Sequence, residues 1–551
     1  MNAASAARLQ TIARTLRAGA RNVLRHVPGE RPRAVVVELE GAILPRAERP
    51  RFFGLPLRPP GAAATPSMEA IGEALDDVCR APWIERVVFR VHDLRVDAAT
   101  AFALRRRVAA VRAAGKHTVA YLTELDWQSY YVASAAAEIV VPESADIGLR
   151  GLGLSVTFMR DALAKIGVRF EKLAIDEYKS AFDELVLQEM SAAQREQLEA
   201  LLDRFYAHHL AAMAEHGRVD VERARALVDE GITSAEQARA AGLVDRVAYE
   251  DEIIDASHRP LAAARRFIPA RSPSLGKRVA MIAITGAIVT GKSRSMPIPI
   301  PGAGGRTAGS ETVASALRAA RADEGTAAVV LYVDSGGGSA LASDLIGREV
   351  ERLREKKPVV AVMGQVAASG GYYVLAPASR VFCAPTTITG SIGVLTGKLV
   401  LEDLYARLGL HAERIARGRH ALLLDPTRPL GDGERALLGR ANEEIYDRFV
   451  ARVAAGRRLS VDRVREIGRG RIWSGVDAVE IGLADEIGDL DAGVACAKAL
   501  AGLGPDAPVW DVPAPEELVL PSADPEAMLA AILPLSRETS WLMLPARIRV
   551  G

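Results

Sequence analysis

The chain has 551 residues, of which 49% are hydrophobic and 25% are charged, so it is long enough for roughly two to four domains and too apolar to be generally disordered. Lys and Arg number 70 and Asp and Glu number 69, which gives a net charge of +1 and no whole-chain field that would attract nucleic acid. The three cysteines lie far apart without metal-ligand spacing, which argues against a disulfide framework or a zinc site and suits a reducing compartment. They are Cys79, Cys383 and Cys496.

Residues 1–31 are predicted to form a basic amphipathic helix. Residues 1–27 lack the long apolar core of a signal peptide, and no stretch of the chain reaches the roughly 18 apolar residues of a transmembrane helix. Apolar side chains and arginines fall on different helical faces, which is typical of a helix on an anionic membrane surface; packing on the protein's own body or on a second subunit is the alternative. We therefore expect a peripheral membrane or cytoplasmic location. The apolar face is Leu9, Ile12, Leu16, Ala20, Val23 and Val27, and the basic face is Arg14, Arg17, Arg21 and Arg25.

An internal repeat organises the rest of the chain. A shift of 242 residues superposes two stretches without a gap, for example Val87–Val91 on Val329–Val333 and Tyr130–Val132 on Tyr372–Val374. One constant offset over about 85 residues indicates a duplicated unit rather than chance matches. The two halves also open with similar apolar strands.

The repeat divides the chain into five parts. They are the N-terminal helix at 1–31, the first repeat at 32–259, a linker at 260–275, the second repeat at 276–503 and a proline-rich tail at 504–551. The tail is expected to wrap around the body in an extended form and to end in a short apolar segment, Trp541–Leu544. In each repeat a Pro/Gly-rich stretch follows the first strand and is interpreted as a mobile loop, at Pro50–Pro66 and Pro297–Gly309.

Each repeat is predicted to be an α/β unit with parallel sheet layers and flanking helices. Short apolar runs alternate with helical stretches, and continuous apolar runs are typical of buried parallel strands. In the second repeat the predicted strands are Val279–Ile284, Ala327–Val333, Val359–Val362 and Arg380–Cys383. The predicted helices there are Thr312–Arg321, Ala340–Lys356, Gly371–Ala376, Leu399–Leu408 and Gly433–Arg458.

The second repeat carries a serine and several glycines that the first repeat lacks. Ser369 and the two glycines after it lie at a predicted strand-to-helix turn, an arrangement that exposes a nucleophile beside backbone donors. Gly336–Gly338 follow an earlier strand, and their backbone amides can point into a site. The equivalent first-repeat residues are Trp127 for Ser369, Leu94, Arg95 and Val96 for the three glycines, and Leu149 for Ser391.

The first repeat carries a lysine that the second repeat lacks. Lys179 lies in the run Tyr178–Ala181, and the offset places Ala421 opposite it. The first repeat thus has a lysine without the serine and glycine turns, and the second has these turns without the lysine. This division is expected of a duplicated enzyme that has split one site between its halves.

These residues resemble the signal peptide peptidase A family in its long, two-repeat form, also called protease IV. The resemblance covers about residues 32–503 and rests on four runs: Tyr178–Ala181, Ser335–Ser339, Ala368–Tyr373 and Thr389–Val394. It implies two tandem ClpP/crotonase-like repeats, hydrolysis of peptides by a Ser/Lys dyad shared between them, and a bowl-shaped tetramer whose sites face an internal cavity. The residue preference before the cleaved bond is expected to be small or medium apolar.

The resemblance assigns roles to particular residues. Ser369 is the nucleophile, Lys179 the general base, and Ser391 orients the lysine amine. The amides of Gly337 and Gly370 are the expected oxyanion donors, with Gly338 as the near alternative. Lys179 can act as a base only when it is neutral, and burial lowers the pKa of a lysine by up to roughly 3 to 5 units. Closing one repeat over the other would supply that burial.

Two features depart from the family pattern. Gly336 stands where the family has a proline, so the turn is expected to be looser. The long members have an N-terminal transmembrane helix, whereas here the basic amphipathic segment 1–27 takes that place. Anchoring and membrane side are therefore open.

Three other interpretations are compatible with the sequence. His420 and Asp425 would form a triad with Ser369 if the base were a histidine. A crotonase-like acyl-CoA hydratase or hydrolase would use the same glycines without a Ser/Lys pair, and a non-catalytic membrane-associated scaffold would use neither. No cofactor and no metal are predicted, because no phosphate-binding or dinucleotide motif appears and the adjacent His208 and His209 do not suit one ion.

Overall fold

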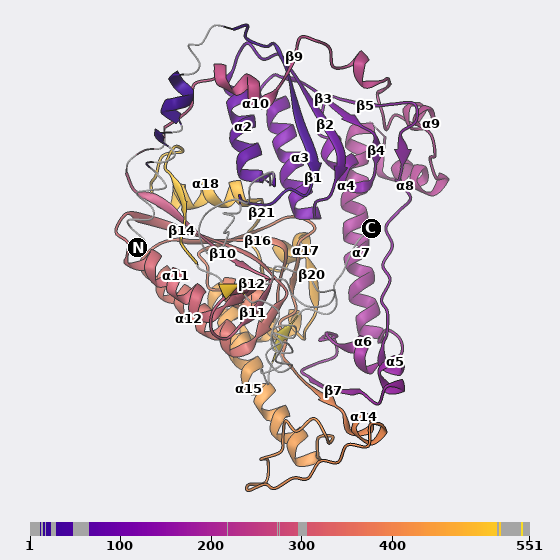
Figure 1. Cartoon of the computed structure of the whole chain (residues 1–551), viewed down its shortest axis with the longest axis vertical. Coiled ribbons are helices and arrows are strands. Elements are labelled where there is room, and N and C mark those ends of the chain that lie inside the picture. Colours follow the sequence, from indigo (N-terminus) through magenta and orange to yellow (C-terminus); the bar gives the residue numbers. More distant parts are fainter. Residues whose placement is uncertain are drawn as a thin grey trace.

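The computed structural model describes residues 29–47, 65–217, 219–272, 276–295 and 306–514, with short pieces at 12, 15–16, 18–23, 274, 517–518 and 541–543. Each half of the chain builds one mainly parallel sheet with helices against it, and a third sheet is shared between the halves. In Figure 1 the first-repeat sheet, in indigo and violet, lies above the second-repeat sheet, and the long helices α7 and α15 run down from the two sheets.

The first repeat is built on a parallel sheet with the strand order β8-β5-β3-β2-β1-β9. Its helices begin at side-chain caps, as where Asp97 accepts a hydrogen bond from the Thr100 amide at 2.7 Å. The strands of this half are β1 (Ala34–Gly41), β2 (Arg86–Leu94), β3 (His117–Leu122), β4 (Glu124–Leu125), β5 (Glu138–Val141), β6 (Asp146–Ile147), β7 (Arg169–Ala174), β8 (Arg246–Val247) and β9 (His258–Pro260). The helices are α2 (Met68–Arg80), α3 (Ala98–Ala113), α4 (Trp127–Ala133), α5 (Arg160–Lys165), α6 (Asp183–Val186), α7 (Ala192–Gly217), α8 (Val221–Glu230), α9 (Ala235–Ala240) and α10 (Leu261–Ala264).

The second repeat has a corresponding sheet with the order β20-β18-β16-β14-β10-β22. Its strands, with those of the shared sheet, are β10 (Arg278–Thr285), β11 (Ala287–Val289), β12 (Arg294–Ser295), β13 (Arg306–Gly309), β14 (Thr326–Ser335), β15 (Gly337–Ser339), β16 (Val359–Ala368), β17 (Arg380–Cys383), β18 (Ile388–Gly390), β19 (Leu395–Val400), β20 (Ile472–Ser474) and β21 (Glu486–Ile487). The helices are α11 (Ser310–Ala322), α12 (Ala340–Arg354), α13 (Gly370–Leu375), α14 (Glu402–Arg407), α15 (Asp432–Arg457), α16 (Val461–Ile467), α17 (Gly475–Glu480) and α18 (Leu490–Leu500).

The predicted repeat is visible in these bounds. A shift of 242 residues carries β5 onto β17 and α5 onto α14 without any change in length. The four predicted strands and four of the five predicted helices of the second repeat are confirmed, with bounds that differ by a few residues.

The predicted helix Leu399–Leu408 is wrong at its start. Leu399 and Val400 belong to strand β19, and α14 begins only at Glu402. β19 pairs antiparallel with β7 of the first repeat, a partner from a distant part of the chain that the local pattern does not reveal. In the predicted loop Pro297–Gly309, residues 306–309 form β13, whereas 297–305 lie outside the described residues, as do 50–64 of the predicted loop Pro50–Pro66.

The shared sheet brings part of the first repeat into the second. Its order is β23-β12-β13-β11-β15-β24-β19-β7, and the β7–β19 ladder runs from Arg169↔Val400 to Ala174↔Leu395. Figure 1 shows α5, β7 and α6 far from the first-repeat sheet and close to α14. The pairing of β7 with β19 therefore places the loop that follows β7 against the second repeat.

The tail adds short strands to the second half. β22 (Val509–Asp511) pairs with β10, and β23 (Glu517–Leu518) pairs with β12. β24 (Trp541–Met543) lies between β15 and β19. The described pieces of the tail are thus extended, as the sequence predicts, and residue 544 of the predicted apolar segment lies outside the described residues.

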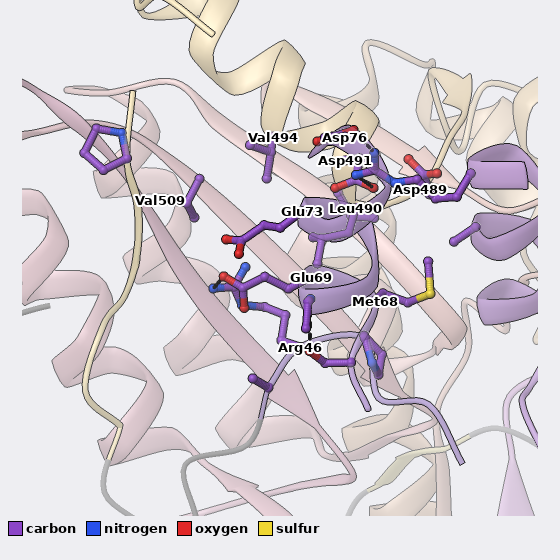
Figure 2. A pocket seen from close by; sticks show the side chains of 18 of the residues that line it. Arg46, Met68, Glu69, Glu73, Asp76, Asp489, Leu490, Asp491, Val494 and Val509 are labelled. Carbon is purple, nitrogen blue, oxygen red and sulfur yellow. Dashed lines mark hydrogen bonds and ion pairs between the residues drawn. The ribbon is translucent and has the colours of Figure 1, made fainter. Parts of the chain in front are cut away.

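A cavity of about 730 Å³ lies where the two repeats meet, lined by α2 on one side and α18 and β22 on the other. Arg46 pairs with Glu69 of the first repeat and with Asp511 of the tail. Arg107 likewise bonds to Asp491 of α18 at 2.6 Å. Figure 2 shows Arg46 beside Glu69, with Asp76 and Asp491 further along the same cavity. Ion pairs therefore cross the seam between the repeats.

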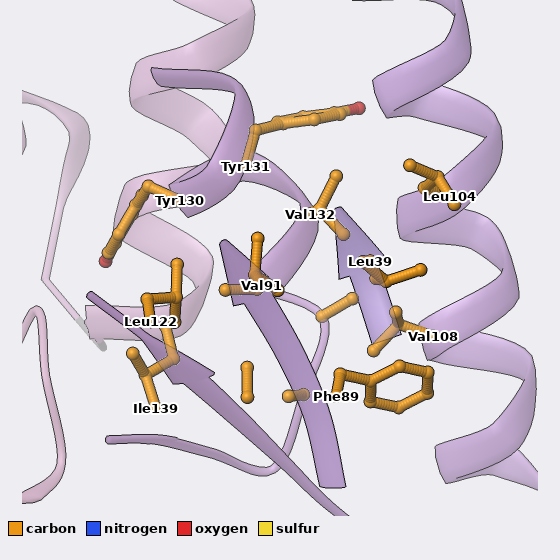
Figure 3. Close-up of a cluster of buried hydrophobic side chains, with 14 of the residues drawn as sticks. Leu39, Phe89, Val91, Leu104, Val108, Leu122, Tyr130, Tyr131, Val132 and Ile139 are labelled. Carbon is orange, nitrogen blue, oxygen red and sulfur yellow. The ribbon is translucent and has the colours of Figure 1, made fainter. Parts of the chain in front are cut away.

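The core of the first repeat lies between its sheet and helices α3 and α4. Phe89 and Leu122 are 1% and 0% exposed, and Figure 3 shows the two residues among side chains from neighbouring strands and helices. Burying one such side chain contributes about 1.5 to 3 kcal/mol. The second repeat has an equivalent cluster of buried apolar side chains, so each repeat has its own packed core.

The N-terminal segment is described only in pieces. Ala18 is buried and Arg21 forms an ion pair with Asp77 at 2.7 Å, so this side of the segment faces the body. Ile12, Leu16 and Val23 are exposed. Across the described part of the chain, no helix combines the length and the apolar character needed to cross a membrane.

Candidate active site

Ser369 lies on a strained turn between β16 and α13. It has a φ of 54°, in a region that non-glycine residues rarely adopt and that often marks a functional residue. Its amide donates to the Gly390 carbonyl at 2.8 Å, and the side chain is 0% exposed. A Cβ on Gly371 would collide with the Ser335 carbonyl oxygen. The turn after the serine therefore requires glycine at that position.

Lys179 of the first repeat reaches Ser369 of the second. Its Nζ lies 2.7 Å from Ser369 Oγ, 2.9 Å from Ser391 Oγ and 2.9 Å from the Ser391 carbonyl oxygen. The structure thus brings together the three residues to which the sequence assigned nucleophile, base and orienting group. In the ammonium form the lysine donates to all three oxygens, and in the neutral form its lone pair would lie along one of these contacts.

Burial controls the charge of Lys179. The side chain is 1% exposed, and desolvation holds its pKa well below the usual lysine value, with the positive charge of Lys172 acting in the same direction. A carboxylate beside the amine would have the opposite effect. The environment therefore favours the neutral amine that a general base needs.

The three glycines predicted as oxyanion donors lie together. A Cβ on Gly370 would lie 3.1 Å from Gly337 Cα and 3.2 Å from Gly338 N. Gly337 and Gly338 have φ values of 101° and 157°, which favour glycine. The Gly337 amide is not free, because it donates to Ser335 Oγ at 3.1 Å. Gly338 and Gly370 are therefore the stronger candidates in this conformation.

The Ser335 side chain also bears on the Gly336 departure. Ser335 Oγ donates to the Gly286 carbonyl at 2.6 Å while it accepts from the Gly337 amide. These two bonds fix the turn on either side of Gly336 without a proline ring. The looser turn that the sequence suggested is thus tied down by its neighbours.

Two contacts around the lysine had no sequence signal. A Cβ on Gly470 would collide with the Lys179 backbone, so the segment before β20 packs directly on the lysine. Lys172 Nζ donates to the Lys179 carbonyl at 2.6 Å. An isolated lysine in a strand does not stand out in a sequence, because lysines are mostly exposed. The local pattern around Gly470 likewise gives no sign of its contact with a distant segment.

The alternative catalytic groups are not assembled. Asp425 bonds to Arg414 and Thr427, and within the described residues His420 Nδ1 has no hydrogen-bond partner. His208 and His209 bond to the Tyr131 hydroxyl and the Phe205 carbonyl. A triad of Ser369, His420 and Asp425 is thus not formed.

Comparison with known proteins agrees with the predicted repeat. Residues 110–263 and 351–504 both match the family model described as Peptidase family S49. The chain belongs to peptidase family S49. The predicted kinship and the predicted fold class, two tandem α/β repeats with parallel sheet layers and flanking helices, are therefore confirmed.

Several curated proteins are similar to this chain. It is 32% identical to "Serine protease SPPA, chloroplastic" of Arabidopsis thaliana, over 73% of this chain and 61% of that protein. It is 28% identical to "Protease 4" of Haemophilus influenzae, over 72% of this chain and 67% of that protein. The third, "Protease 4" of Salmonella typhi, is 30% identical over 71% of this chain and 65% of that protein. The chain thus spans roughly two thirds or less of the length of these relatives.

A solved structure of a mutant ClpP1 from Listeria monocytogenes is also similar. The identity is 16% and the TM-score 0.25, over 39% of this chain and 94% of that chain.

Proposed function

We propose that the protein is a serine endopeptidase that hydrolyses peptides such as cleaved signal peptides. In this proposal Ser369 is the nucleophile, Lys179 the general base, and Ser391 the group that orients the lysine amine. The observation that carries it is the 2.7 Å contact between Lys179 Nζ and Ser369 Oγ, made by residues of two different repeats in a buried site. Membership in a peptidase family supports the same reaction.

The reaction follows from the geometry. Neutral Lys179 takes the proton of Ser369 as Oγ attacks the scissile carbonyl carbon. The amides of Gly338 and Gly370, joined by Gly337 if it leaves Ser335, stabilise the negative oxygen; losing one such donor typically costs about 10² to 10³ in kcat. The lysine then gives its proton to the leaving amine, and it activates the water that releases the acyl group.

The position of β24 supports a peptide as the substrate. The strand pairs antiparallel with β15, with Gly337↔Met543 and Gly338↔Leu542 as partners, and Leu395 of β19 pairs with Trp541. The slot between β15 and β19 therefore accepts an extended chain through backbone contacts, the mode known as strand addition. A peptide substrate would lie in that slot beside the candidate oxyanion glycines. Among the described residues, no comparable feature favours the acyl-CoA or the scaffold hypothesis.

Hydrolysis of short apolar peptide anilides tests the proposal. Ser369→Ala and Lys179→Ala should each lower kcat/KM by roughly 10⁴-fold or more, because nucleophile and base act as a unit. In the wild type kcat/KM should rise with pH through a pKa below the usual lysine value, since the base acts only when it has lost its proton. The measurement is kcat/KM for the three proteins between about pH 6 and 10, spanning the region below the ordinary lysine pKa.

His420→Ala is the matched control, and it should keep the wild-type rate. An active Lys179→Ala variant together with a dead His420→Ala variant would contradict the assignment of the base. A wild-type protein that does not hydrolyse a broad set of peptides, but binds coenzyme A, would favour the hypothesis of an acyl-CoA hydratase or hydrolase.

Occupation of the slot by residues 541–543 predicts that the tail competes with substrate. A variant that ends at residue 540 should show a KM for peptides that is roughly 2- to 10-fold lower, with kcat unchanged, because more of the protein has an empty slot. Leu542→Pro, which places a residue without a backbone N–H and with a fixed φ in β24, should act in the same direction. Steady-state kinetics of the three proteins measure the effect, and an unchanged or raised KM in both variants would count against it.

We further propose that the protein forms a homo-oligomer, with a tetramer as the form that the family resemblance implies. Large apolar side chains are exposed near α14, with Leu408 at 64% and Ile415 at 90%. Sedimentation velocity should therefore give a species of several chains. Ile415→Asp should shift it to a smaller species, whereas Val461→Asp, an exposed position on α16, should not. A monomeric wild type would contradict the proposal.

Contact with a membrane surface is proposed for residues 1–27. In the described pieces, Arg21 faces the body and the apolar residues Ile12, Leu16 and Val23 are exposed. The protein should co-sediment with vesicles that contain anionic lipid, and Leu16→Asp combined with Val23→Asp should abolish this binding. Equal recovery of both proteins in the supernatant would instead favour the cytoplasmic location.

A further inference from the structure

A second lysine lies directly behind the proposed base. Lys172, on β7, is 10% exposed in its side chain and pairs with Asp183 at the start of α6. Its Nζ also donates to the Lys179 carbonyl at 2.6 Å. Both acceptors suit an ammonium, which has three hydrogens to donate and no lone pair. The group is therefore tied to the lysine loop through both a carboxylate and the main chain.

The ion pair closes the loop that carries Lys179. The loop runs from the end of β7 to the start of α6, and Asp176 and Phe182 within it both have a φ of 67°. Non-glycine residues in this region are strained and persist only when the surroundings hold them. Lys172 and Asp183 stand at the two ends of the loop, so their contact holds it in the shape that directs Lys179 at Ser369.

Lys172, Asp183 and Lys179 affect one another's charge. Burial lowers the pKa of Lys172, and Asp183 and Glu184 oppose that shift. Burial raises the pKa of Asp183, which Lys172 opposes in turn. The positive charge of Lys172 in turn acts on Lys179.

Other charged side chains near the loop are paired with carboxylates. From the segment before β20, Arg469 bonds to Asp176 and Glu177, and Arg471 bonds to Glu196. Their charges are balanced by exposed carboxylates. Among the described residues, Lys172 is thus the charged group with the largest electrostatic effect on the buried Lys179 amine.

The second repeat keeps the same pair without the base. The 242-residue offset places Arg414 opposite Lys172 and Asp425 opposite Asp183, and Arg414 Nε lies 2.6 Å from Asp425 Oδ2. Ala421 occupies the position of Lys179. The Lys172–Asp183 ion pair therefore has an equivalent in the second repeat, and only the first repeat also carries a lysine at the position of Lys179.

We propose that Lys172 is a positioning residue for the peptidase site: paired with Asp183, it fixes the loop that carries Lys179, and its positive charge at the Lys179 backbone disfavours a second charge on the lysine amine. This inference rests on the proposed function, in which neutral Lys179 is the base.

The test is the pH dependence of kcat/KM for peptide hydrolysis. Lys172→Gln keeps a donor for the Lys179 carbonyl but removes the charge, so the acidic limb of the profile should move to higher pH by about one unit. Asp183→Asn leaves the charge of Lys172 less neutralised, so the limb should move to lower pH. Lys172→Arg should restore the wild-type limb. A purely structural role would lower the rate in these variants without moving the limb in opposite directions.

Arg414→Gln is the matched control, because it removes the equivalent ion pair in the repeat that has no lysine base. It should leave the limb in place, and thermal unfolding followed by circular dichroism should report any loss of fold in each variant. If Lys172→Gln does not fold, the Asp183→Asn and Lys172→Arg profiles decide the matter.

The outcomes separate this inference from the proposed function. A wild-type limb that disappears in Lys179→Ala but stays unmoved in both Lys172→Gln and Asp183→Asn overturns the role of Lys172 alone. A wild type without peptidase activity overturns the function and this inference with it. Opposite shifts in the two variants support both.

Discussion

The Lys179 amine lies 2.7 Å from the Ser369 hydroxyl although the two residues are separated by 190 positions. Much of the architecture around the site is needed to make that contact. The β7–β19 ladder carries the lysine loop out of the first repeat, and Gly470 allows the second repeat to close on its backbone. The same closure removes water from the amine, so one packing event both positions the lysine and lowers its pKa.

Duplication explains why such a long-range site is stable. Each repeat has its own sheet and core, so neither depends on the site for folding, and each can lose half of the reactive groups. In the first repeat the position of the serine is filled by Trp127, which is buried and donates to the Gly151 carbonyl at 3.0 Å. Trp127 cannot act as a nucleophile, and at this position it contributes to the core instead. The ion pairs of the seam then hold the two bodies in register.

Much of the site could be predicted from the sequence, and the reasons are physical. Ser369 and its glycines have a strong local pattern because a strained turn admits few residues. Lys179 could be found by comparing the two repeats, which exposes what each has lost, and by the family resemblance of the run Tyr178–Ala181. Lys172 and Gly470 could not be found, because their roles arise from contacts with distant segments. For the same reason the end of β19, Leu399 and Val400, was predicted as helix, since its strand partner β7 lies in the other repeat. The tail was predicted to be extended, but its place between β15 and β19 depends on a slot that only the folded chain has.

The most direct test of the shared site is the rate at which a fluorophosphonate labels the protein, since this needs no knowledge of the natural substrate. Peptide mass spectrometry should place the label on Ser369, and the labelling rate should rise with pH through a pKa below the usual lysine value. Lys179→Ala should label far more slowly and without that rise. Labelling at another residue, or an unchanged rate and pH profile in Lys179→Ala, would contradict a serine activated by a lysine from the other repeat.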